Sequence, residues 1–345
     1  MRYFISLIII CHLCNSLFAQ TNSENGYWNP NRGEIRVLLV YAELLNDPNY
    51  SSVTQPGWPA GQMPLDPGKY FDSQVSTNPS GYITRYFSNA SYGEYKVIGD
   101  YYPSLIQLDY NNISSTNYFS KVIEALNNTV GADLLTAHNF SINNHDFDKW
   151  SNYNFGTEKL ESPDNLNDMI IVLYRVNSYI TGTQNPGTNT GSVNPSAINL
   201  TLKNSSGFNC RSNFVSFNND AEVIMRHEFS HSIYGGNNFH TAGCGAGTRT
   251  FLSSVGGYSN MSSWDSNSQG WNGWDRWRMG WKNPNKQHLI SAYNASNNNE
   301  IDFENYSIQN NPLGGEYILR DFSSTGDAIR IKIPILKHTE FSYIY

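Results

Sequence analysis

Cysteine is scarce in this chain of 345 residues, which contains four cysteines in all. Cys11 and Cys14 fall in the N-terminal segment, so the body of the chain contains only Cys210 and Cys244. Neither of these has a CxxC partner, which disfavours a structural zinc site built on paired cysteines. In an oxidising compartment the two could form a disulfide, but two unrelated buried thiols fit the sequence equally well.

Basic charge and long apolar runs are also missing. Lys and Arg number 22 against 29 Asp and Glu, and the net charge is -7 without any basic run. This balance argues against nucleic acid or an anionic membrane surface as the main partner. After the N-terminal segment, no stretch approaches the ~20 apolar residues that a transmembrane helix needs, so the mature protein is expected to be free of the membrane.

The N-terminus has the order of a secretory signal peptide. Arg2 precedes an apolar run from Phe4 to Leu13, and a small residue, Ala19, ends the segment. We therefore expect residues 1–19 to be removed and the protein to be secreted. A retained anchor and a lipoprotein signal at Cys14 are the alternatives, but the residues before Cys14 are not the small ones that a lipoprotein signal requires.

Two short β-branched runs and one helical pattern indicate an α/β or α+β fold. Glu34–Leu44 and Asp168–Val176 are apolar runs bounded by polar residues, as in buried strands. Asn117–Val130 lies between them and spaces its apolar residues at helical intervals. Residues 177–219 are rich in Gly, Asn, Ser and Thr, which predicts a long loop with one edge strand near Ala197–Leu202.

The segment HEFSH, His227 to His231, provides the strongest functional indication. Asn219 and Gly235 are suited to begin and end a helix of about four turns around it. On such a helix His227 and His231 share one face, where a single zinc ion can bind both imidazoles. Glu228 is then placed to act as general base on water at the metal. The structural alternative is a surface helix with two solvated histidines.

A third metal ligand is required, and His240 is the best candidate. It follows Gly235 and Gly236, which allow the chain to turn back toward the metal. Asp265 and Asp275 are weaker candidates. A distant glutamate is disfavoured because the first Glu after Glu228 is Glu300, in a stretch predicted to be β-structure.

These residues resemble the metzincin pattern HExxHxxGxxH and, within it, the immune inhibitor A-like secreted metallopeptidases of bacteria. Three further segments are similar to that family: Tyr86–Tyr102, Trp274–Trp281 and the terminal HTEFSYIY. The third histidine departs from the pattern. It lies nine positions after His231, where the family pattern has six.

The resemblance implies a metzincin-like zinc peptidase domain with a mixed sheet and an active-site helix. It also implies a methionine turn beneath the metal, for which Met261 is the first candidate and Met279 the second. Tyr258, in the same turn as Met261, is a candidate oxyanion donor. Structural calcium is common in the family, and the Asp-rich stretch Asn143–Trp150 offers oxygen ligands for it.

The expected organisation is a signal peptide, residues 1–19, a catalytic domain, residues 20–290, and a β-rich segment, residues 291–345. Alternating patterns from Glu300 onward indicate short strands, and the chain ends at Tyr345 inside another such run, so this segment is expected to be truncated. The expected function is secreted, zinc-dependent cleavage of protein or peptide. The alternatives are a non-catalytic surface-binding protein that keeps the fold, and a zinc hydrolase of a non-peptide substrate.

Overall fold

The computed structural model divides the chain into two compact units, residues 25–89 with 95–239 and residues 90–94 with 240–345. The predicted domain boundary at residue 290 stays a prediction, and the signal peptide lies outside the described residues. The structure describes residues 29–49, 51–114, 117–129, 135–141, 146–151, 159–175, 199–200, 208–210, 213–217, 221–234, 271–305, 315–332 and 343–344.

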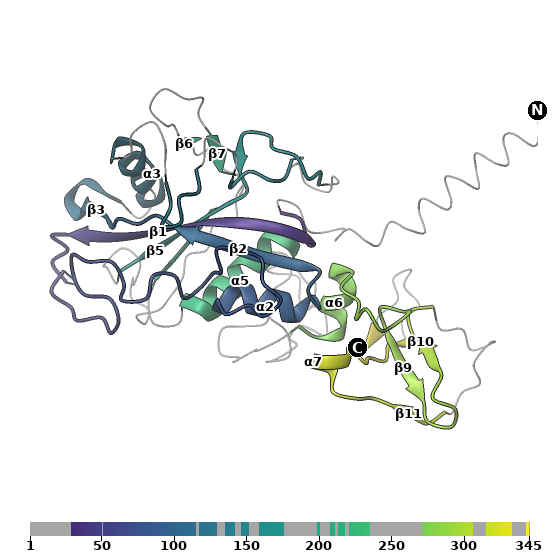
Figure 1. Ribbon diagram of the computed structural model, residues 1–345. Helices are drawn as coiled ribbons and strands as arrows, with labels where there is room; N and C mark the ends of the chain where they lie inside the picture. Colours follow the sequence, from purple (N-terminus) through teal and green to yellow (C-terminus); the bar gives the residue numbers. More distant parts are fainter. Residues whose placement is uncertain are drawn as a thin grey trace, which may run out of the picture. The chain divides into compact units, whose positions relative to one another are not determined.

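A parallel sheet forms the centre of the first unit (Figure 1). Its strands are β1 (Gly33–Leu45), β2 (Tyr95–Tyr101), β3 (Ile106–Asp109), β5 (Met169–Tyr174) and β8 (Asn213–Phe217). Strand β1 pairs with β5 on one side, while β2 and then β3 pair with successive parts of its other side. Strand β8 pairs with β5, and every pairing among these described strands is parallel.

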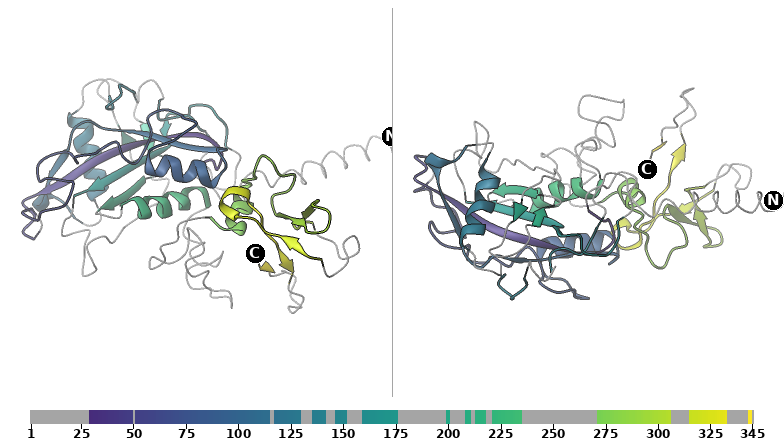
Figure 2. Two further views of the ribbon diagram at one scale, coloured as in Figure 1. Left: turned by 60° about the horizontal axis from the view of Figure 1, so that its bottom comes forward. Right: turned by 90° about the horizontal axis from the view of Figure 1, so that it is seen from above.

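Helices cover both faces of this sheet (Figures 1 and 2). Helix α2 (Tyr82–Ala90) connects β1 to β2, α3 (Tyr118–Thr129) connects β3 to β5, and α5 (Ala221–Tyr234) follows β8. Helix α3 lies on one face, and α2 and α5 lie on the other. The predicted strands around Glu34–Leu44 and Asp168–Val176 and the predicted helix in Asn117–Val130 are confirmed by β1, β5 and α3.

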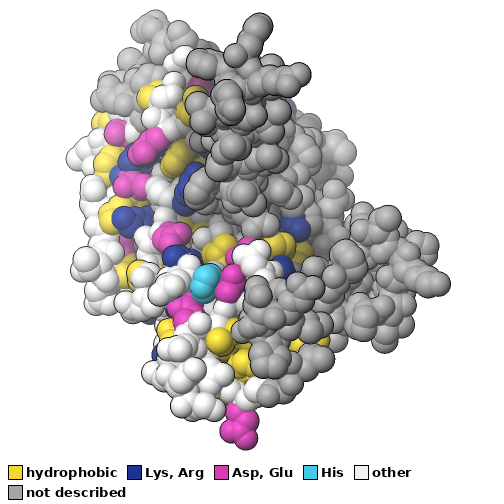
Figure 3. All heavy atoms as spheres, turned by 90° about the vertical axis from the view of Figure 1, so that its right-hand side faces the viewer, with side chains coloured by type: hydrophobic (Ala, Val, Ile, Leu, Met, Phe, Trp, Pro, Cys, Tyr) yellow, Lys and Arg dark blue, Asp and Glu magenta, His cyan; other side chains and the backbone are white. Residues whose placement is uncertain are grey.

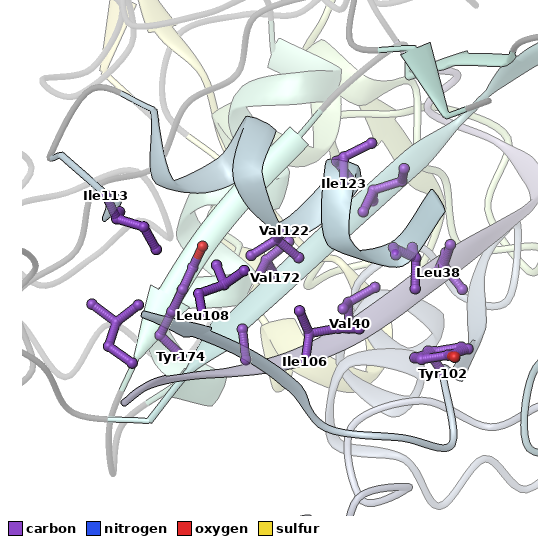
Figure 4. Packing of buried hydrophobic residues seen from close by; sticks show 14 of the residues in the cluster. Leu38, Val40, Tyr102, Ile106, Leu108, Ile113, Val122, Ile123, Val172 and Tyr174 are labelled. Atoms are coloured by element: carbon purple, nitrogen blue, oxygen red, sulfur yellow. The ribbon is translucent and has the colours of Figure 1, made fainter. Parts of the chain in front are cut away.

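The core explains why β1 is apolar along most of its length. Leu38 and Val40 point toward α3 and pack with its Val122 and Ile123 (Figure 4). Leu39, between them, is also buried, and the alternation of side chains along a strand places it on the opposite face of the sheet. A parallel strand that is covered on both faces requires such a continuous run, because neither face meets water.

The predicted loop of residues 177–219 is corrected in part. Its edge strand is confirmed as β6 (Asn199–Leu200), which pairs with β7 (Phe208–Cys210), and β7 also pairs with β4 (Leu166–Asn167). However, β7 and β8 also lie in this stretch. They are short and follow Ser- and Asn-rich sequence, and β8 is stabilised by its pairing with β5 instead of by a long apolar run of its own.

The second unit contains short strands and helices around a small core of Ile290, Ala292 and Phe303. Strands β9 (Ser291–Asn294), β10 (Glu300–Asp302) and β11 (Tyr317–Ile318) form one antiparallel sheet, and β12 (Ile331–Lys332) pairs with β13 (Tyr343–Ile344). The unit also contains helices α6 (Gly273–Met279) and α7 (Phe322–Thr325).

Helix α7 lies between two alternating runs, Glu316–Phe322 and Asp327–Pro334, which contain the short strands β11 and β12. Asp321 caps its N-terminus by accepting a hydrogen bond from the backbone of Ser324 at 2.9 Å. Gly326 ends the helix in the left-handed region, with φ of 73°. Local capping by these two residues therefore makes a single helical turn between β11 and β12.

The surface of the described residues shows mixed charge. On the face seen in Figure 3, Lys and Arg side chains are interspersed with Asp and Glu side chains. None of the helices in the described part of the chain is both long and apolar enough to cross a lipid bilayer. The expected absence of nucleic acid and membrane partners stays a prediction.

A buried ion cluster stabilises the second unit. The Lys286 ammonium donates hydrogen bonds to Asp327 Oδ1 at 2.9 Å, to the Ser291 carbonyl at 2.8 Å and to the Gly326 carbonyl at 3.2 Å. Arg320 donates three hydrogen bonds to the same carboxylate, each of 2.9 Å. Burial by itself would raise the pKa of Asp327, but the hydrogen bonds from Arg320 and Lys286 outweigh it and hold that pKa well below its ordinary value.

The cluster predicts a pH-dependent stability. Because the folded pKa of Asp327 lies below the unfolded value of about 3.9, its stabilisation is present above that pH and is lost as pH falls through the folded value. Asp327→Asn is therefore expected to lower the free energy of unfolding by about 2–3 kcal/mol at pH 7. Urea unfolding of both proteins at several pH values should show this difference shrinking below about pH 4. A difference that stays constant down to pH 2 would contradict the assignment.

Candidate functional site

The predicted motif helix is confirmed as α5, an α-helix of 14 residues. It begins at Ala221 and ends at Tyr234, so the whole HEFSH segment is helical. For His227, Glu228 and His231 the description covers the backbone and not the side chains. Positions 227 and 231 are one turn apart on a continuous helix, as binding of one metal ion by two histidines requires.

One side of α5 is anchored in the core. Met225, Phe229 and Ile233 are buried, and their spacing of four residues places them on one face of the helix. Positions 227 and 231 each follow one of these anchors by two residues, which corresponds to a rotation of roughly 200° around an α-helix. The two histidine positions therefore fall on the side opposite the buried anchors.

An aromatic cluster joins α5 to the sheet. The Phe229 ring lies 5.0 Å from the Phe87 ring of α2 and 6.3 Å from the Tyr95 ring of β2, measured between centroids. Phe87 and Tyr95 also contact each other edge to face at 5.8 Å. Burial raises the pKa of Tyr95 well above its ordinary value, so this phenol stays neutral. The residue after Glu228 is thus packed against two other elements, α2 and β2.

The first half of α5 contains a partly buried ion pair. Arg226 lies 3.7 Å from Glu222, one turn earlier, and its guanidinium sits over the Tyr86 ring at 4.7 Å from the centroid. The Ser230 hydroxyl donates to the Arg226 carbonyl at 2.7 Å. Arg226 is 5% exposed, so this cation is fixed directly before His227 in the chain.

Several predicted site residues lie outside the described residues. These are His240, Cys244, Tyr258, Met261 and Asp265. Cys210 is the last residue of β7, and only its backbone is described. The third ligand, the disulfide and the methionine turn therefore stay predictions.

The weaker candidates that the structure does describe have structural roles in the second unit. Asp275 and Asn272 form a capping box at the start of α6, with reciprocal hydrogen bonds of 3.2 and 2.8 Å. Met279 is the buried last residue of that helix. Glu300 accepts hydrogen bonds from the backbone of Gln287 and His288. The roles at a metal site considered for Asp275 and Met279 stay predictions.

The candidate calcium segment uses its described carboxylates to fix loops. Asp146 accepts a hydrogen bond from the backbone of Ser141 at 2.8 Å. Asp148 accepts one from Asp164 at 3.0 Å and one from Asn165 at 2.7 Å. Within the described residues, no group of three or more His, Cys, Asp or Glu is arranged to hold a metal ion. Calcium binding here stays a prediction.

Sequence reasoning missed a buried ion pair at the end of the central strand. Arg175, directly after β5, lies 3.4 Å from Glu43 of β1, and both side chains are almost fully buried. Glu43 also accepts a hydrogen bond from the backbone of Gly61 at 2.8 Å, and Arg175 donates to the carbonyl oxygens of Trp58 and Val53. The signal in the sequence was a charged residue in or next to each of two apolar strands.

Comparison with known proteins leaves the family open. No protein-family model matches the chain, and no curated protein matches it significantly. The resemblance to immune inhibitor A-like metallopeptidases thus rests on the motifs alone and stays a prediction. The chemistry has to be argued from the residues of α5.

Proposed function

We propose that this protein is a secreted, zinc-dependent endopeptidase. The proposal is carried by one observation, the HEFSH segment on a continuous helix whose opposite face is anchored in the core. Anchoring on one face is common to surface helices, so the motif with Glu228 beside the first histidine is what favours zinc chemistry over two solvated histidines. The N-terminal segment, which has the order of a signal peptide, and the family-like segments outside HEFSH add support from the sequence.

The donor set fits a catalytic zinc ion. His227 and His231 would provide two imidazole ligands from neighbouring turns, and His240 would provide the third from the chain after Gly235 and Gly236. Three protein ligands leave one position open for the reaction, which distinguishes catalytic from structural zinc sites. The departure in spacing at His240 makes this residue the critical one to test.

Glu228 has the chemistry of a general base and acid. Zinc, when bound, supplies Lewis acidity that brings the pKa of water near 7 and polarises a carbonyl group. Glu228 takes the proton from the attacking water and then delivers it to the leaving amine. With protein or peptide as the proposed substrate, the bond that breaks is the amide C–N bond.

The test is metal content together with cleavage of casein. The purified protein is expected to contain about one zinc per chain and to cleave casein, and chelation followed by added zinc should abolish and restore cleavage. His240→Ala is expected to lose both zinc and activity, because two histidines alone bind zinc weakly. The measurements are elemental analysis and release of soluble peptides.

His288→Ala is the matched control. His288 lies in the second unit, where its Nδ1 is 3.5 Å from Asp302 Oδ2, and it is not among the proposed zinc ligands. Its replacement should therefore leave zinc content and activity unchanged. If His240→Ala retains zinc, another residue is the third ligand. A protein that binds zinc but cleaves neither protein nor peptide would instead be a surface-binding protein or a hydrolase of a non-peptide substrate. A protein that binds no zinc would refute the proposal.

A further inference from the structure

We draw no further inference here: the strongest candidate, the small polar cavity of the second unit lined in part by Tyr92, Arg276 and Lys286, carries none, because the three hydrogen bonds of the Lys286 ammonium go to groups of the protein itself and nothing in the described part of the chain shows what occupies the cavity.

Discussion

Glu228→Gln is expected to lower the rate of casein cleavage by about 10²–10⁴-fold while leaving zinc content unchanged. Glutamine has nearly the same shape as glutamate but cannot accept the proton of the attacking water. Glu228 is not among the proposed zinc ligands, so its neutralisation should not release the metal. The measurements are kcat/KM on a peptide substrate and zinc per chain, both on purified protein.

Glu222→Gln provides the matched control on the same helix. Glu222 lies in the first turn of α5 and pairs with Arg226 at 3.7 Å, so its replacement removes an equal charge away from the motif. Activity within about threefold of wild type is expected, since partly exposed ion pairs contribute little. Loss of zinc in Glu228→Gln would show that the carboxylate acts as a ligand, and full activity would exclude it as the base.

The parts of the fold that the sequence predicted are those with long, regular patterns. Strand β1, helix α3 and helix α5 each extend over enough residues for periodicity or capping to identify them. Strand β8 has five residues and follows polar, loop-like sequence. Its structure depends on pairing with β5, a contact that no local pattern encodes.

The same distinction applies to the site. HEFSH is a local motif, so the helix and the positions of its residues followed from spacing alone. The contacts that hold the helix join residues far apart in the chain, such as Phe229 with Phe87 and Ser232 with Asn29. A backbone hydrogen bond like that of Asn29 leaves no trace in residue type, so the sequence could not predict this contact.

Glu43→Ala is expected to lower the free energy of unfolding by about 3–5 kcal/mol, because it leaves the buried guanidinium of Arg175 without its carboxylate. The substitution also removes the acceptor for the backbone N–H of Gly61. Removal of a carboxylate from a buried, hydrogen-bonded pair is costly because the remaining cation cannot be solvated. Urea unfolding followed by tryptophan fluorescence measures the change.

Two further variants separate burial from charge. Glu124→Ala breaks the ion pair with Lys121, in which the Glu124 side chain is 59% exposed and the Lys121 side chain 40% exposed. It should lower the free energy of unfolding by at most about 1 kcal/mol. The double variant Glu43→Leu with Arg175→Met replaces both charges by apolar groups and should be less destabilised than Glu43→Ala alone. If Glu43→Ala is no more destabilising than Glu124→Ala, the pair at the end of β1 does not support the sheet. Arg175 also donates hydrogen bonds to the carbonyl oxygens of Trp58 and Val53, in the loop that follows β1. Glu43→Ala should therefore also speed amide hydrogen exchange in that loop.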